Sequence, residues 1–142
     1  MLNIGEFYIV FTLGLEDNNL SEIKIENNNN NNNILDNLLN VKIFRNNNKQ
    51  PEIYTFNTDN SPFTIGRNDD CEIYINDNIL SRTHCTIEYR NNSWYIIDGY
   101  FNEVNEKKNS TNGTWIYANE ECEIKEGMTF KANHNLFRCK FV

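Results

Sequence analysis

Short runs in which apolar and polar residues alternate dominate this chain. Such runs, when rich in β-branched and aromatic residues, are typical of half-buried β-strands. The pattern predicts an all-β fold, a two-sheet antiparallel β-sandwich of about eleven strands joined by turns rich in Asn, Asp and Gly. The predicted strands are Phe7 to Leu13, Val41 to Phe44, Glu52 to Phe56, Phe63 to Gly66, Glu72 to Ile75, His84 to Tyr89, Trp94 to Asp98, Thr114 to Tyr117, Cys122 to Ile124, Thr129 to Ala132 and Asn135 to Phe141.

The first third of the chain interrupts this pattern with a polar stretch. Asn27 to Asn33 is an unbroken run of seven asparagines. Such a run buries too little apolar surface to offset the entropy of ordering, so Asp17 to Asn37 is predicted to be an insertion between two strands. Apolar residues at helical spacing within 34–39 are compatible with one helical turn. We therefore divide the chain into an N-terminal strand with the Asn-rich insertion, residues 1–38, and a main β domain, residues 39–142.

Composition narrows the classes of function. With 142 residues, of which nine are Phe, seven Tyr and two Trp, the chain can build one domain with a real core. Its net charge of −7 argues against a nucleic-acid partner or an anionic membrane surface, since both favour clustered Lys and Arg. Any phosphate site must then be a local basic pocket. The chain lacks a Walker loop, a G-x-S-x-G elbow, an H-E-x-x-H helix and a kinase signature, so we do not expect an enzyme.

The cysteines favour an intracellular protein. Cys71, Cys85, Cys122 and Cys139 form no C-x-x-C pair, and with two histidines they make no zinc pattern, so neither a metal nor a cofactor is expected. They are interpreted as small apolar residues on strands. Their even number allows two disulfides, but a domain of this size needs none, which favours reduced thiols and a location in the nucleus or cytoplasm. The apolar stretch at residues 7–15 lacks the flanks of a signal peptide and is interpreted as a strand.

Four short sequence motifs indicate the function. They occur in a fixed order on strand-like sequence, and three of them fall in loops that the strands would bring to one edge. They are Gly66-Arg67, Ser81-Arg82-Thr83-His84, Trp94-Tyr95-Ile96-Ile97-Asp98 and Ser110-Thr111-Asn112-Gly113-Thr114. Taken singly, each of the three loop motifs also fits an ordinary surface turn. Together, from about Leu39 to Val142, they resemble the forkhead-associated (FHA) domain, a β-sandwich module that binds phosphothreonine.

The resemblance implies roles for residues of the first two motifs. Arg67, in the loop after a strand, would grip the phosphate, and a guanidinium suits this because it can donate two parallel hydrogen bonds in a fixed fork. Gly66 would let the backbone turn closely beside it. Ser81 would donate its hydroxyl and its backbone amide, and Arg82 would add a second positive charge. His84 would buttress the loops; because strand side chains alternate, it should point away from its neighbour Cys85, which argues against a catalytic Cys-His pair.

The fourth motif would complete the binding site for the ligand. Thr111 would touch the phosphate, the Asn112 side chain would bond the main chain of the ligand, and Gly113 would return the chain to the next strand. The stretch from Gly99 to Asn109 is longer than the connection usual in the family, and its Lys107 and Lys108 would flank the ligand. Which of the first two predicted strands, Phe7 to Leu13 or Val41 to Phe44, is the first strand of the family stays open.

The sequence thus predicts a signalling module whose interactions with other proteins depend on phosphothreonine. Its phosphopeptide contacts would be Arg67, Ser81, Arg82, Thr111 and Asn112. The partner would be a phosphothreonine-containing protein or peptide, bound by a monomer or by one module of a larger signalling protein. The alternative is a phosphate-independent scaffold or homodimerisation domain, which would not require these residues together.

Overall fold

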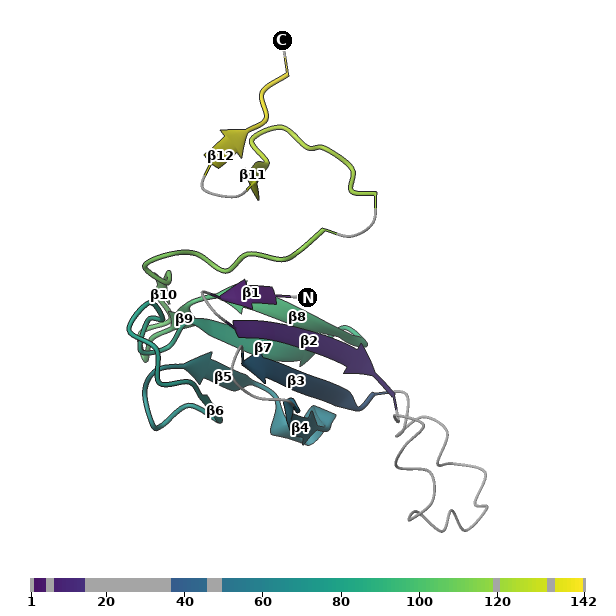
Figure 1. The fold of residues 1–142 in the computed structure, drawn as a ribbon, viewed down its shortest axis with the longest axis vertical. Coiled ribbons are helices and arrows are strands. Elements are labelled where there is room, and N and C mark those ends of the chain that lie inside the picture. Colours follow the sequence, from purple (N-terminus) through teal and green to yellow (C-terminus); the bar gives the residue numbers. More distant parts are fainter. Residues whose placement is uncertain are drawn as a thin grey trace.

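The fold is seen in a computed structural model, which describes residues 2–4, 7–14, 37–45, 50–118, 121–132 and 135–141. Two four-stranded sheets lie one over the other and form a β-sandwich (Figure 1). The first sheet contains, in spatial order, β1 (Leu2–Ile4), β2 (Phe7–Leu13), β3 (Leu39–Arg45) and β4 (Glu52–Phe56), and every neighbouring pair is antiparallel.

The second sheet has the order β6-β5-β7-β8. Its strands are β5 (Phe63–Gly66), β6 (Ile73–Tyr74), β7 (Cys85–Arg90) and β8 (Ser93–Asp98). Strands β5 and β6 run parallel, whereas β5 with β7 and β7 with β8 are antiparallel. The predicted all-β two-sheet fold is confirmed, with one parallel pair that the prediction did not include.

The core forms where the inward faces of the two sheets meet. On β3, Val41 and Ile43 are fully buried while Lys42 between them is only partly covered, as the alternation of a strand requires. The Phe56 ring of the first sheet stacks on the Phe63 ring of the second, with centroids 3.7 Å apart. The buried cluster comprises Ile9, Leu39, Val41, Ile43, Phe63, Ile65, Ile73, Ile75, Leu80, Cys85 and Ile87.

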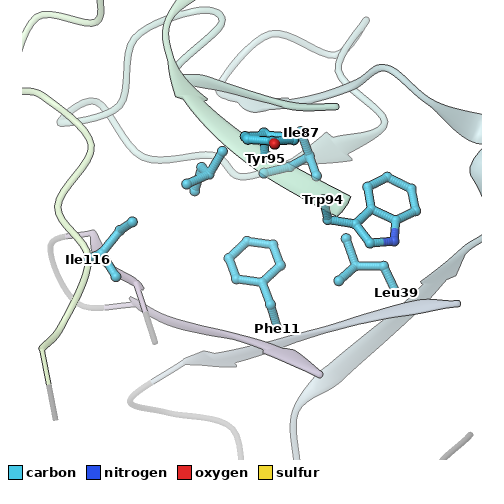
Figure 2. A pocket seen from close by; sticks show the side chains of 7 residues that line it. Phe11, Leu39, Ile87, Trp94, Tyr95 and Ile116 are labelled. Atoms are coloured by element: carbon cyan, nitrogen blue, oxygen red, sulfur yellow. The ribbon is translucent and has the colours of Figure 1, made fainter. Parts of the chain in front are cut away.

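An apolar cavity of about 180 Å³ lies between the sheets. Its walls come from β2, β3, β7 and β8 and from Ile116 farther along the chain; the lining residues are Phe11, Leu39, Ile87, Trp94, Tyr95, Ile96 and Ile116 (Figure 2). No Lys or Arg lies among these lining residues, so the cavity offers no charge to hold a phosphate.

Two small hairpins complete the described part of the chain. Strands β9 (Tyr100–Phe101) and β10 (Lys107–Lys108) pair within the stretch that the sequence marked as an insertion, and they lie at the left end of the sandwich in Figure 1. Strands β11 (Thr129–Ala132) and β12 (Asn135–Arg138) stand apart from both large sheets, and all of their residues are exposed. On this second hairpin the rings of Phe130 and Phe137 stack with centroids 5.0 Å apart.

Several predicted strands match the structure closely, and two are wrong. Strands β2, β4, β5 and β11 have the predicted bounds, and β3, β6, β7, β8 and β12 differ at their ends. Residues 114–117 and 122–124 form no strand: among the described residues of these segments Ile116 alone lies in an isolated bridge, and neither segment joins one of the sheets. Strands β1, β9 and β10 were not predicted; each has only two or three residues.

Two other expectations meet the structure differently. The asparagine run and residues 34–36 of the expected helical turn lie outside the described residues, while Leu39 begins β3. All four cysteines are free thiols, with Cys71 and Cys85 buried and Cys122 exposed. Only Cys85 lies in a strand, so the expectation of strand positions was wrong for the other three. Among the described residues, no helix is long and apolar enough to cross a membrane.

Candidate functional site

Three loops meet at the end of the sandwich where β5 ends and β7 begins. The first loop, residues 67–72, follows β5; the second, residues 75–84, joins β6 to β7; the third, residues 109–114, follows β10. Antiparallel pairing of β5 with β7 places the first two loops side by side, and Figure 1 shows the β9–β10 hairpin at the same end. Every candidate binding residue predicted from the sequence lies in one of these three loops.

Backbone hydrogen bonds join the first loop to the second. The Arg67 amide donates to the Ser81 carbonyl at 3.1 Å, and the Asn68 amide donates to the Arg82 carbonyl at 3.0 Å. The loops are so close at Gly66 that a Cβ there would collide with the Arg82 carbonyl oxygen. Glycine is therefore required at residue 66 by the approach of the neighbouring backbone. The close approach fixes where the exposed Arg67 side chain begins.

Side-chain hydrogen bonds join the second loop to the third. The Thr111 amide donates to Ser81 Oγ at 2.8 Å, and Ser81 Oγ donates to Thr111 Oγ1 at 3.2 Å. Farther along, Asn112 Nδ2 donates to the Ile79 carbonyl at 2.8 Å. Ser81 is thus bonded to both other loops, through its carbonyl to Arg67 and through its hydroxyl to Thr111. The structure thus brings together Arg67, Ser81 and Thr111, three of the five candidate binding residues.

His84 lies beneath these loops, with 1% of its surface exposed. Its Nδ1 accepts a hydrogen bond from the Ser81 amide at 3.3 Å, which places the imidazole proton on Nε2. Its backbone amide donates to Ile65, and its carbonyl accepts from the Gly99 amide, each at 2.8 Å. Because the Ser81 amide already donates to His84, only the Ser81 hydroxyl is exposed to a ligand without rearrangement of the loop.

Burial lowers the pKa of His84, because the cation would lose its hydration. The Gly113 backbone and the Asp98 carboxylate favour the protonated form and only partly offset that effect. The interaction with Gly113 is weak, since Nε2 is buried without a hydrogen bond of standard geometry. The histidine is therefore neutral near pH 7, and its hydrogen bonds join it to the second loop; its supporting role stays a prediction.

Asp98, at the end of β8, closes the third loop. Its carboxylate accepts from Ser110 Oγ at 2.6 Å, from the Ser110 amide at 3.3 Å and from Thr114 Oγ1 at 2.8 Å. Burial alone would raise the pKa of Asp98, but the hydrogen bonds from Ser110 and Thr114 outweigh it and hold the pKa below its ordinary value. These three residues lie in the sequence motifs, but the sequence analysis gave them no role. The pattern that could have indicated it is a carboxylate before the insertion and two hydroxyl residues after it.

The far side of the third loop is shaped by Asn112 and Gly113. Gly113 has a positive φ of 74°, a conformation that suits glycine, and the Asn112 carbonyl accepts from Trp115 Nε1 at 2.9 Å. The Asn112 side chain is exposed and uses Nδ2 on the second loop. Its Oδ1 accepts no hydrogen bond from the described residues and can accept one.

Exposed cations lie at this end of the sandwich although the net charge of the protein is −7. Within the described residues, Arg67, Arg82 and Lys107 are exposed and form no ion pair. Asp69 and Asp70 are also exposed in the first loop, and Asp70 accepts from Asn68 Nδ2 at 2.8 Å. In the part of the chain that the structure describes, no group of three His, Cys, Asp or Glu side chains is placed to hold a metal ion.

The fold and these loops define a β-sandwich whose loops at one end present cations and hydrogen-bonding side chains. Residues 63–131 match the family model of the FHA domain, which supports the resemblance seen in the sequence. FHA domains are generally phosphopeptide-binding modules for protein–protein interaction. The match begins at β5, and the boundary proposed at residues 38 and 39 stays a prediction. Searches of curated proteins and of solved structures gave no significant match.

Proposed function

We propose that this protein docks a phosphothreonine peptide reversibly across the three loops, without chemistry on the ligand. The observation that carries the proposal is the position of Ser81, which is hydrogen-bonded to Arg67 in the first loop and to Thr111 in the third. A phosphate above Ser81 would lie beside side chains that can donate from all three loops. Charge-assisted hydrogen bonds of this kind are about twice as strong as neutral ones.

Each predicted contact has a distinct part in this proposal. The Arg67 guanidinium binds two phosphate oxygens. Ser81 Oγ turns its hydroxyl hydrogen from Thr111 Oγ1 to the phosphate, and the Thr111 hydroxyl donates there as well. Arg82 adds a second positive charge. Asn112, held at Nδ2 by the Ile79 carbonyl, offers Oδ1 to a main-chain N–H of the ligand and so fixes the direction of the peptide.

The choice of threonine over serine, and the place of the protein in signalling in the nucleus or cytoplasm, are carried by the family resemblance. In the family the threonine methyl enters a small apolar pocket beside the phosphate. Matched phosphothreonine and phosphoserine peptides test that preference directly, because they differ only in this methyl group. A buried methyl contributes about 0.8 kcal/mol, so a several-fold preference for phosphothreonine is expected.

The proposal is tested by binding to an oriented phosphothreonine peptide library, beside the same library without phosphate. Arg67→Ala should weaken phosphate-dependent binding by about 2 to 4 kcal/mol, since the phosphate then lies without its main cation. Arg90→Ala is the matched control, because Arg90 lies at the other end of β7, where it pairs with Glu88 and covers Tyr95. Equal binding of phosphorylated and unphosphorylated peptides by the folded wild type would refute the proposal.

The alternative function, a phosphate-independent scaffold or homodimer, is favoured by one observation. The stacked rings of Phe130 and Phe137 are 42% and 46% exposed on the β11–β12 hairpin. Apolar surface of this kind is common in interfaces between proteins. Sedimentation of the wild type and of Phe137→Ser at several concentrations decides this point, because a homodimer through the hairpin would dissociate in the variant.

A further inference from the structure

The β9–β10 hairpin is joined directly to the loops of the proposed site. At its start, the Gly99 amide donates to the His84 carbonyl at 2.8 Å, and Thr86 Oγ1 donates to the Gly99 carbonyl at 2.7 Å. At its end, Ser110 is bonded to Asp98. Both ends are therefore fixed to the residues that hold the second and third loops, so the hairpin keeps one position beside the site.

The turn of the hairpin is also held by hydrogen bonds. The Asn102 amide donates to the Glu106 carbonyl at 3.0 Å, and the Glu106 amide donates to Asn102 Oδ1 at 2.8 Å. Asn105, with φ of 58°, donates from its amide to the Asn102 carbonyl. A turn with this many internal bonds loses little freedom when it binds a ligand, and such preorganisation favours recognition.

The two lysines of β10 have different surroundings. Lys108 Nζ pairs with Glu106 Oε2 at 3.0 Å, and strand alternation places the side chains of Lys107 and Lys108 on opposite faces of the hairpin. Lys107 lies opposite Phe101 in the register and therefore on the other face. Within the described residues Lys107 has no acidic partner, and Phe101 beside it is 51% exposed. This face thus presents an uncompensated cation next to an exposed aromatic ring.

We propose that Lys107 and Phe101 form a subsite that reads the residues flanking the phosphothreonine, favouring an anionic side chain next to an apolar one. This inference rests on the proposed function, because the peptide must already lie across the three loops. Charge complementarity selects the anion, and the fixed base of the hairpin makes the subsite continuous with the third loop. The anion can be an Asp or Glu side chain or a second phosphate, since both satisfy an ammonium group.

The experiment compares peptides that share one phosphothreonine and differ in a flanking position, which carries Glu, phosphoserine, Gln or Lys. The wild type should bind the Glu and phosphoserine peptides several-fold more tightly than the Gln peptide, and the Lys peptide most weakly. Lys107→Glu should invert this order, with the total swing between Glu and Lys peptides on the order of tenfold or more. Lys108→Glu is the matched control, because it adds the same charge on the opposite face.

Three outcomes would overturn the inference. The wild type could bind the four peptides equally, Lys107→Glu could keep the wild-type order, or Lys108→Glu could change the order as much as Lys107→Glu does. Phe101→Ser gives a second reading, since it should remove the preference for an apolar neighbour while the charge preference persists. Loss of the difference between phosphorylated and unphosphorylated peptides in the wild type would instead refute the proposed function and the subsite with it.

Discussion

The amide of Thr111 donates a 2.8 Å hydrogen bond to the hydroxyl of Ser81, thirty residues earlier in the chain. This bond makes the second and third loops one unit. Neither residue is buried, so the bond must be maintained in competition with water. The pair therefore sets the spacing of the hydroxyl groups that we propose for the phosphate.

Ser81→Ala removes both the proposed phosphate donor and the acceptor for the Thr111 amide. Phosphopeptide affinity should fall by about 1.5 to 3 kcal/mol, the range for a hydrogen bond to a charged group. Unfolding in urea should change little, since Ser81 lies at the surface. Calorimetric binding to one phosphothreonine peptide measures the first quantity, and Ser93→Ala, at the far end of the sandwich, is the control. Unchanged affinity in Ser81→Ala would remove Ser81 from the site.

Gly66→Ala should be costly although the substitution is small. The added Cβ collides with the Arg82 carbonyl and also approaches Thr83, so the backbones of the first two loops must separate. Overpacking of this kind costs about 1 to 3 kcal/mol, and phosphopeptide binding should weaken with it. Thermal unfolding and peptide binding check both. Gly14→Ala is the comparison, because a Cβ there meets open space and only its positive φ opposes the change. An equal loss of stability in both variants would contradict the collision.

Stability should fall as the pH drops below about 6.5, the ordinary pKa of histidine. Burial lowers the pKa of His84 in the folded state, so the unfolded state binds the proton first and gains from it. The pKa of Asp98 is also lowered, and its contribution is lost only at a lower pH, below the ordinary value of 3.8.

Urea unfolding at a series of pH values separates the two groups. His84→Gln should be less stable than the wild type at pH 7 and should bind peptide more weakly, because the Ser81 amide loses its acceptor. Its stability should also vary less between pH 6.5 and 5. His134→Gln, which replaces the other histidine of the chain, is the control for titration elsewhere. A slope that disappears in His134→Gln and persists in His84→Gln would contradict the assignment.

Reactivity toward thiol reagents should differ sharply among the cysteines. Burial, with smaller effects of Asp98 and Cys71, raises the pKa of Cys85 to about 12, so its thiolate is scarce at neutral pH. Cys122 is exposed. Iodoacetamide at pH 8 should therefore modify Cys122 in the native protein and leave Cys71 and Cys85 intact until denaturant is added. Mass spectrometry of the digested protein reads this pattern, and rapid native modification of Cys85 would contradict its burial.

The strands predicted with the correct bounds each pair with at least one neighbouring strand along their length. Phe63 to Gly66 reads as a strand because its apolar positions face the core between two partners. The segment 114–117 has similar composition, yet in the described part of the chain only its Ile116 forms an isolated bridge, and strand propensity alone does not supply a partner strand. The pairs in β9 and β10 were missed because two-residue strands carry too little pattern to be seen.

The sequence predicted the local motifs of the candidate site but not the contacts that depend on the path of the chain. The motifs around Arg67, Ser81 and Asn112 are short stretches of consecutive residues, and the structure brings their loops to one end of the sandwich. The role of Asp98 depends on a chain reversal that returns Ser110 and Thr114 to it, which no local pattern encodes. Likewise, the collision that demands glycine at residue 66 is set by the path of the second loop. The functional roles of the binding residues stay predictions until binding is measured.

The hydrogen bond between Asp98 and Ser110 joins the two ends of the β9–β10 insertion. The chain between these residues can therefore vary in length and composition without moving the loops that would hold the phosphate. This makes the insertion a natural graft point, where replacement by a short linker, or by a hairpin with other side chains, would leave the fold intact. Phosphate binding and the preference for residues beside the phosphothreonine can then evolve separately. Related domains could therefore acquire new partners while still binding phosphothreonine.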